Sequence, residues 1–217
     1  MTVLAFRTSA DVATAIPIVV DHLQNGGLIA HPTETVYGVG SRANNSDLAA
    51  LADLKGRASD KPFLLLIASV EMAVEFGLTL TPAARALAHR FWPGPVTLVL
   101  NGGEGRLPDT LRGPEGGIAV RWTSHSPTAS LIECLQAPMS STSANTPGAR
   151  TAPGVGALLE MFGKAVESGL LMVLDGGVLG NVPPSTLIDC TQPAPRLIRE
   201  GAIPLTELRT GVGRFAP

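Results

Sequence analysis

Short apolar runs alternate along this chain with segments that repeat apolar residues at helical spacing, and this alternation most strongly constrains the fold. Phe63–Ala68 is an unbroken apolar run too short for a helix, which is typical of a strand buried on both faces. Leu28–His31 is a second short run of strand length. Ser9–Gln24 instead carries apolar residues every three or four positions, as an amphipathic helix does. The pattern predicts one α/β domain.

The other expected elements continue the alternation. We expect strands at Val96–Leu100, Ile118–Trp122, Met139–Ser143, Leu170–Leu174, Ser185–Asp189 and Arg196–Arg199. Helices are expected at Asp47–Leu54, Val70–Phe76, Pro82–Phe91, Thr128–Gln136 and Val155–Val166. Because several late strands follow one another through short turns, the sheet should be mixed rather than purely parallel. The domain is expected over residues 1–204, and the tail Leu205–Pro217 is too short for a second domain.

The charge balance argues against a dedicated nucleic-acid binder. Sixteen Lys and Arg stand against eighteen Asp and Glu, which gives a formal net charge of -2. A protein held to a polyanion by counterion release usually has a basic excess. A local basic groove is still compatible with sixteen cations.

Cysteine and histidine spacing predicts no metal site. Cys134 and Cys190 stand far apart, without a CxxC pair, and the four histidines show no ligand spacing. The N-terminus has no secretory leader pattern, and no run of about 18 apolar residues suggests a membrane span. A cytoplasmic location without membrane association is therefore expected.

Three cations gather at the end of the helix expected over Asp47–Leu54. Lys55 and Arg57 flank one glycine, and Lys61 follows before the next buried strand. Arg forks onto phosphate oxygens and Lys supplies a mobile point charge, so nucleotide phosphates are one interpretation. The other is positive charge that complements the helix dipole. The cations alone leave both open.

Two polar segments, Pro32–Gly40 and Ser140–Asn145, follow expected strands. Ligands in open α/β sheets usually sit at such strand ends. Each segment also fits a structural turn, because glycine and hydroxyl side chains favour turns. The side chains that could contact a ligand are Thr35, Tyr37, Ser141, Ser143 and Asn145.

Arginines end two further strands. Arg121 closes an apolar run, where burying a guanidinium is costly unless an anion meets it. That anion could be a substrate carboxylate, which suits the fork of the guanidinium, or an internal Asp or Glu. Arg199 ends a later strand, and Ser185 begins the strand before it.

The common catalytic and phosphate-binding signatures are absent from the sequence. There is no GxxxxGK[ST], no GxGxxG and no GxSxG. No pair of carboxylates stands out as a general acid and base. The sequence therefore favours chemistry that depends on positioning and charge stabilisation over a protein nucleophile.

Taken together, the motifs resemble the YrdC-like threonylcarbamoyl-AMP synthase family. The similarity runs in the family's order over roughly residues 28–201. Its segments are Pro32–Gly38, Lys55-x-Arg57, Phe91–Thr97, Ala119–Arg121, Ser141–Asn145 and Pro184–Asp189.

The resemblance implies a fold and a reaction. The fold would be an open, twisted, mixed α/β sheet flanked by helices, with a concave, positively lined cavity. Family members make threonylcarbamoyl-AMP and pyrophosphate from L-threonine, bicarbonate and ATP, for the N6-threonylcarbamoyladenosine (t6A) modification of tRNA. Mg2+ is expected, held mainly by the ATP phosphates, since the sequence shows no carboxylate cage. The expected partners are small-molecule substrates, tRNA-modifying threonylcarbamoyl transferase proteins that take over the product, and weakly or transiently bound tRNA.

The resemblance also assigns roles to residues. Lys55 and Arg57 would be the catalytic cations. The nucleotide would be bound by Lys55, Arg57, Lys61, Ser143, Asn145, Thr151 and Arg199. Threonine would be bound by Thr35, Tyr37, Arg121, Ser141 and Ser185.

Three positions depart from the family pattern. Ala58 stands where a proline usually follows the Lys-x-Arg motif, and His31 stands where an aromatic residue commonly precedes Pro32. Leu66 occupies a strand position where some members carry a histidine, so a side-chain contact to threonine is not expected there. Two other functions are left as alternatives: a non-catalytic module that binds tRNA or double-stranded RNA, and carbamoyl transfer through a carbamoyl adenylate.

Overall fold

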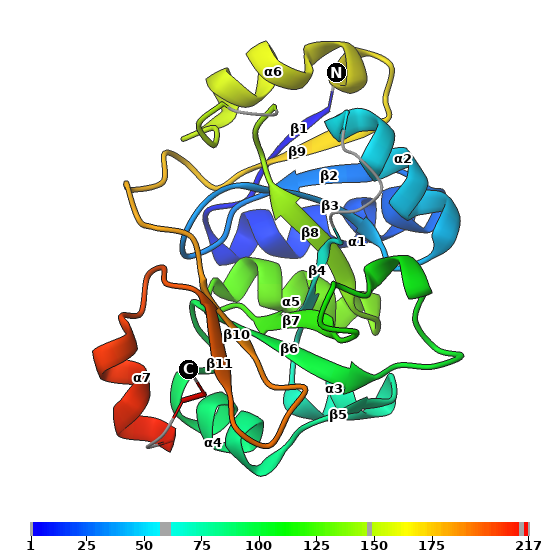
Figure 1. Ribbon diagram of the computed structural model, residues 1–217. Coiled ribbons are helices and arrows are strands. Elements are labelled where there is room, and N and C mark those ends of the chain that lie inside the picture. Colours follow the sequence, from blue (N-terminus) through cyan, green and yellow to red (C-terminus); the bar gives the residue numbers. More distant parts are fainter. Residues whose placement is uncertain (1, 57–61, 147–148, 213–214, 217) are drawn as a thin grey trace.

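The computed structural model describes residues 2–56, 62–146, 149–212 and 215–216. Within these ranges, eleven strands and seven α-helices form a mixed sheet with helices on both faces (Figure 1). The strands are β1 (Val3–Ala5), β2 (Leu28–His31), β3 (Gly38–Arg42), β4 (Leu64–Ile67), β5 (Leu78–Thr79), β6 (Val96–Gly102), β7 (Ile118–Trp122), β8 (Met139–Ser143), β9 (Leu171–Asp175), β10 (Thr186–Asp189) and β11 (Arg196–Arg199).

The order of the strands across the sheet is β1-β9-β2-β3-β8-β4-β7-β6-β10-β11, and β5 pairs with β6. Four pairs are parallel: β1 with β9, β2 with β9, β4 with β7, and β6 with β10. The other pairs are antiparallel. The prediction of a mixed sheet is confirmed.

The α-helices are α1 (Ser9–Gln24), α2 (Asn45–Lys55), α3 (Val70–Glu75), α4 (Pro82–Phe91), α5 (Ser126–Leu135), α6 (Val155–Glu167) and α7 (Leu205–Val212), with a 3-10 turn over Asp109–Leu111. The first five helices, α1 to α5, begin at side-chain caps that satisfy one of their first N–H groups, whereas α6 begins at Gly154 without a side-chain cap. Thr8 caps α1 in a capping box. Asn44 caps α2, because its side chain accepts from the N–H of Asp47.

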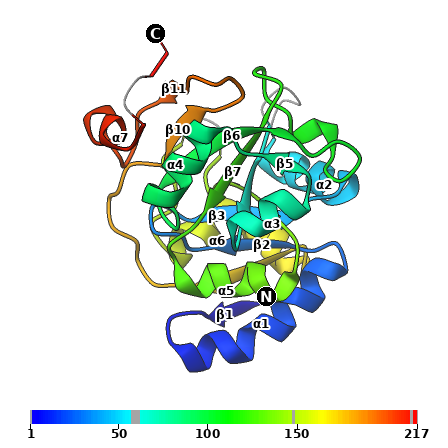
Figure 2. The same cartoon turned by 90° about the horizontal axis from the view of Figure 1, so that it is seen from below.

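Apolar residues pack in two clusters. One joins Leu66 of β4 and Met139 of β8 to apolar side chains of α1 and α5, which lie side by side in Figure 2. The other cluster joins strand residues such as Leu65 to α2, α4 and α6. Alternate residues of a strand therefore serve different clusters, as the two faces of a covered sheet require.

The prediction of a loop over Pro32–Gly40 is wrong at its end, because β3 begins at Gly38. The two glycines of β3 suggested a turn, but they permit close strand approach. A Cβ atom at Gly40 would lie 2.2 Å from the backbone oxygen of Ser140 in β8. Three short elements were not predicted: β1 has 3 residues, β5 has 2 and α7 has 8.

The segment expected only as a C-terminal tail contains α7. Its Leu208 is fully buried in the larger apolar cluster, and α7 packs against α4. Among the described helices, none is both long and apolar enough to cross a lipid bilayer.

Candidate active site

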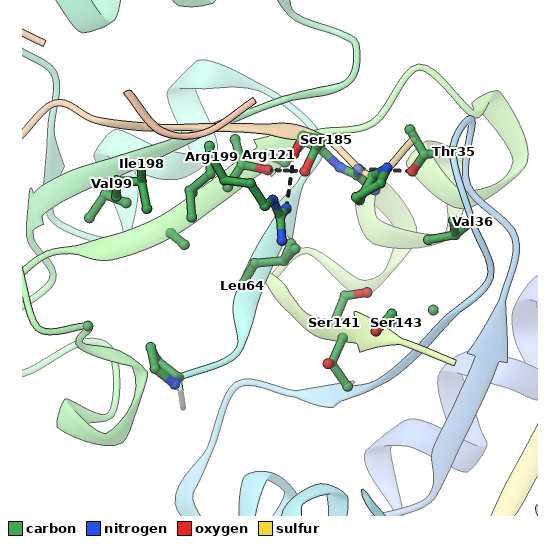
Figure 3. Close-up of a pocket in the computed structure, with 18 of the residues that line it drawn as sticks. Thr35, Val36, Leu64, Val99, Arg121, Ser141, Ser143, Ser185, Ile198 and Arg199 are labelled. Atoms are coloured by element: carbon green, nitrogen blue, oxygen red, sulfur yellow. Dashed lines mark hydrogen bonds between the residues drawn. The ribbon is translucent and has the colours of Figure 1, made fainter. Parts of the chain in front are cut away.

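A cavity of about 570 Å³ lies over β4, β6, β7, β8 and β10 (Figure 3). This volume is in the range of small-molecule sites, which are roughly 300–1,000 Å³. Lining residues of neighbouring strands stand opposite one another in the sheet register, as Leu64 does with Ser141, and Val99 with Ala119. The sheet therefore forms the floor of the cavity.

Seven of the residues predicted to bind substrates line this cavity. They are Thr35, Arg121, Ser141, Ser143, Thr151, Ser185 and Arg199. In Figure 3, Ser141 and Ser143 lie on one side, and Arg121, Ser185 and Arg199 lie on the other. Glu115 also lines it and was not predicted. Arg57 and Lys61 lie outside the described residues.

Arg121 is the penultimate residue of β7, and its guanidinium is buried in the cavity wall. The residue is 4% exposed, and burial lowers the pKa of its guanidinium. Nη1 donates to Oγ1 of Thr35 at 3.3 Å, and Nε lies 4.0 Å from Oε1 of Glu34. Neither Nε of Arg121 nor Oε1 of Glu34 has a hydrogen-bond partner among the described residues. Both alternatives left by the sequence thus meet at this residue, which has an internal carboxylate nearby and unused donor capacity.

The threonine-rich loop before β3 is held by local hydrogen bonds. Oγ1 of Thr33 accepts from the N–H groups of Thr35 and Val36, each at 3.2 Å, and donates to the oxygen of Val36 at 2.7 Å. Hydroxyl side chains commonly order turns in this way. The turn brings Thr35 to Arg121.

Glu34 is a site residue that sequence reasoning missed. Its Oε2 accepts a hydrogen bond from Oγ1 of Thr123, two residues after Arg121. The available signal was the single carboxylate of the loop, placed between two hydroxyl residues. A carboxylate beside a buried guanidinium limits the cost of burying that charge.

Ser185 and Arg199 form the wall contributed by the end of the chain. Oγ of Ser185 is 2.8 Å from Oγ1 of Thr97, and Nη2 of Arg199 donates to the backbone oxygen of Ser185 at 3.0 Å. Burial lowers the pKa of the Arg199 guanidinium. The contact to a neutral carbonyl leaves the positive charge of Arg199 available to an anion in the cavity.

Lys55 joins the end of α2 to the loop after β8. Its Nζ donates to the backbone oxygen of Ser143 at 2.6 Å, to the backbone oxygen of Asn145, and to Oδ1 of Asn145 at 3.1 Å. Oγ of Ser143 also donates to Oδ1 of Asn145, and Nδ2 of Asn145 donates to the oxygen of Ala149. Of these residues, only Ser143 is among the described residues that line the cavity. These hydrogen bonds therefore join Lys55, Ser143 and Asn145, three of the residues predicted to bind the nucleotide.

Tyr37, predicted near threonine, is not among the described residues that line the cavity. Its side chain is fully buried, and its hydroxyl donates to the oxygen of Gly177 and accepts from the N–H of Gly176. The tyrosine thus joins the loop before β3 to the segment after β9. The sequence could not reveal this because the two segments are 139 residues apart.

Leu66, which departs from the family pattern, is not among the described residues that line the cavity. It pairs in register with Arg121 and Met139, but it is fully buried in the cluster beneath α1 and α5. Leu64, two residues earlier, is the β4 side chain that reaches the cavity. The described residues hold no group of three His, Cys, Asp or Glu side chains placed for a metal ion.

Comparison with known proteins identifies the family. The Sua5/YciO/YrdC family model, which carries the description "Telomere recombination", matches residues 21–201. The chain belongs to this family. A threonylcarbamoyl-AMP synthase of Pyrococcus abyssi is 35% identical over 201 residues, covering 92% of this chain and 58% of the relative. One of Thiobacillus denitrificans is 40% identical over 169 residues, covering 77% of this chain and 87% of the relative.

Solved structures agree with the sequence relatives. The crystal structure of P. abyssi Sua5 complexed with L-threonine superposes with a TM-score of 0.88 and 33% sequence identity, over 99% of this chain and 62% of that chain. The predicted family and the YrdC-like fold are therefore confirmed. Relatives that are 30–40% identical over most of this chain are named threonylcarbamoyl-AMP synthase. This chain spans little more than half the length of two of these relatives, 58% of the P. abyssi protein and 54% of the Bacillus subtilis protein.

Proposed function

We propose that this chain is a threonylcarbamoyl-AMP synthase, which joins L-threonine, bicarbonate and ATP and releases pyrophosphate. The observation that carries the proposal is the buried guanidinium of Arg121 in the wall of a hydroxyl-lined cavity. A guanidinium with unused donors is best satisfied by a planar carboxylate, which it can grip with two hydrogen bonds. The P. abyssi relative solved with L-threonine supports an amino-acid carboxylate as that group.

The threonine end of the cavity would be formed around Arg121. Oγ1 of Thr35 accepts a hydrogen bond from the guanidinium, and Ser141 and Ser185 add hydroxyls from β8 and from the residue before β10. Three hydroxyls and one cation suit a small zwitterion that also carries a hydroxyl. Tyr37 would act indirectly, by holding the loop that carries Thr35 against the segment after β9.

The nucleotide end would be formed around Ser143, Thr151 and Arg199, which all line the cavity. Arg199 would meet phosphate charge, and the hydroxyls would bind phosphate or ribose oxygens. Lys55 and Asn145 would position Ser143 through the hydrogen bonds that tie α2 to the loop after β8. The catalytic unit of this proposal is residues 1–204. Direct phosphate binding by Lys55, Asn145, Arg57 and Lys61 remains a prediction from the sequence.

The reaction needs alignment of substrates more than a protein nucleophile. The amine nitrogen of threonine forms a bond to the carbon of CO2 derived from bicarbonate and loses a proton, which gives a carbamate. A carbamate oxygen then attacks the α-phosphorus of ATP, and the bond to pyrophosphate breaks. Cationic side chains stabilise the charge that develops on the phosphates. Binding all three substrates in one cavity supplies the alignment.

The residues present fit a magnesium ion that arrives with ATP. Two carboxylates, Glu34 and Glu115, lie at or beside the cavity, and the described residues form no cluster of metal ligands. Mg2+ commonly keeps several waters and binds mainly through substrate phosphates. When bound, it would neutralise phosphate charge.

The product is a reactive mixed anhydride, so its handover would follow promptly. The proposed recipients are threonylcarbamoyl transferase proteins that modify tRNA, with weak or transient tRNA contact by this chain. Nothing in the net charge of -2 favours strong binding of RNA.

Exchange of labelled pyrophosphate into ATP tests the proposed reaction. Exchange is expected only when both L-threonine and bicarbonate are present. Exchange that needs neither would contradict the proposal. A salt-sensitive shift of RNA without any ATP turnover would favour an RNA-binding module. Transfer of a carbamoyl group to another acceptor, seen as a different product mass, would favour the carbamoyl-transfer alternative.

A further inference from the structure

His31 is the last residue of β2, and its side chain contacts one of the residues that line the cavity. Its Nε2 atom lies 3.1 Å from Oγ of Ser141, and both side chains are buried. The family resemblance left this histidine without a role, because aromatic residues are common at its position. The contact to a cavity hydroxyl gives it one.

The hydrogen bonds of His31 fix the direction of its contact with Ser141. Nδ1 lies 3.3 Å from the backbone oxygen of Pro32, and a carbonyl oxygen can only accept. Nδ1 therefore carries the proton of the neutral ring, and Nε2 is an acceptor. The hydroxyl of Ser141 must then donate to Nε2. Its oxygen presents lone pairs, and no hydrogen, to the cavity.

Burial keeps the ring in this neutral form. His31 is fully buried, and desolvation lowers its pKa to about 3. The ring is therefore neutral at any pH near 7. The carbonyl of Pro32 also accepts from Oγ1 of Thr128 at 2.8 Å, which anchors it to α5. The acceptor that orients the ring is thus itself held in place.

The glycine at the start of β3 leaves room for the pair. A Cβ atom at Gly38 would lie 2.7 Å from Oγ of Ser141 and 2.8 Å from Nε2 of His31. Distances this short are not seen for real side chains, so any larger residue would displace one of the two groups. The sequence at position 38 is therefore matched to a histidine–serine contact on the cavity side of the sheet.

We infer that His31 is a positioning residue that turns the oxygen of Ser141 into a dedicated hydrogen-bond acceptor, and that Ser141 receives the amine of the amino-acid substrate. The inference rests on the proposed function. An amine or ammonium group offers only donors, so it needs acceptors, whereas the carboxylate needs donors such as Arg121. The cavity thereby distinguishes the amine from the carboxylate, because it offers an acceptor to the first and donors to the second.

Threonine kinetics of single and double variants test the inference. Loss of one hydrogen bond should raise the KM for L-threonine roughly fivefold in His31→Phe and about tenfold in Ser141→Ala, with the KM for ATP unchanged. Because both changes remove the same interaction, the double variant should be no worse than Ser141→Ala alone. His31→Gln keeps a side-chain donor and acceptor, and it should recover part of the affinity.

Calorimetry with two ligands separates positioning from damage to the fold. The ligands are L-threonine and (R)-3-hydroxybutyrate, which has the same carboxylate and hydroxyl but no amine. Binding of L-threonine should weaken in His31→Phe, and binding of (R)-3-hydroxybutyrate should not. Equal weakening of both ligands, or effects that multiply in the double variant, would overturn the inference. Wild-type protein that binds L-threonine without supporting pyrophosphate exchange would instead contradict the proposed function.

Discussion

Replacing Arg121 with methionine should remove the response to threonine and leave the fold largely intact. Methionine has a similar length and no charge, so it can occupy the same space in the wall. The guanidinium makes one described hydrogen bond to a side chain, to Thr35 at 3.3 Å, and stands 4.0 Å from Glu34 without bonding through Nε. Its burial is therefore only partly compensated when no ligand is bound.

The magnitudes differ sharply between the empty and the ligand-bound protein. Without threonine, loss of the hydrogen bond and relief from burying the guanidinium oppose each other. The free energy of unfolding should change by less than about 2 kcal/mol. With threonine at a hundred times its Kd, the wild type should gain about 2.7 kcal/mol. A loss of about 3 kcal/mol of charge-assisted binding weakens the site more than a hundredfold, and the variant would gain about 0.4 kcal/mol or less.

Urea unfolding with and without L-threonine measures both quantities on the same samples. Arg7→Met is a matched control, because Arg7 pairs with Asp175 on an exposed surface away from the described cavity lining. That control should keep the full stabilisation by threonine. A comparable threonine-dependent shift in Arg121→Met would refute the assignment of the carboxylate to Arg121.

Three further outcomes follow from the geometry. Gly38→Ala should weaken L-threonine binding by about tenfold or more, because its Cβ would lie 2.7 Å from Oγ of Ser141 and would break the hydrogen bond of that hydroxyl. Gly156→Ala is the control: its Cβ would meet nothing within 4 Å, so this variant should bind L-threonine normally in the same titration. Burial lowers the pKa of His31 to about 3, below its value in the unfolded chain, so the wild type loses stability as the pH falls below about 6.5. His31→Phe lacks this group, so its free energy of unfolding should rise relative to that of the wild type by about 1.4 kcal/mol for each pH unit below about 6.5, measured by urea unfolding. A difference that stays constant with pH would contradict this expectation. The thiol of Cys190 is buried and its pKa is raised to about 12 by burial, so it should react with a thiol reagent only after unfolding, and fast reaction in the folded protein would be the contrary result.

The alternation of apolar runs was enough to predict most of the sheet. Ile118–Trp122 and Met139–Ser143 were placed at their observed bounds, and each buries three of its five residues. β3 was assigned to a loop because its glycines and serine have low strand propensity. Its pairing with β8 and the close approach at Gly40 override that local preference. Such contacts across the sheet cannot be read from a local window.

The candidate site was predicted in outline, and its internal contacts were not. The position of Arg121 near the end of a strand could be predicted from the sequence, because an arginine after an apolar run is unusual. The hydrogen bonds of Lys55 with Asn145 could not be predicted from the sequence, since they join segments 90 residues apart. Roles for Glu34 and His31 could not be predicted from the residues next to them in the sequence. Their partners, Thr123 and Ser141, arrive only when distant strands pair.

Mass spectrometry of the product, made with isotopically labelled bicarbonate, tests the central claim most directly. Purified chain with Mg2+, ATP, L-threonine and labelled bicarbonate should yield pyrophosphate and an adenylate that contains both the threonine and the labelled carbon. Arg121→Met should yield little of it at the same threonine concentration. An adenylate that lacks the label, or one that forms without threonine, would contradict the account.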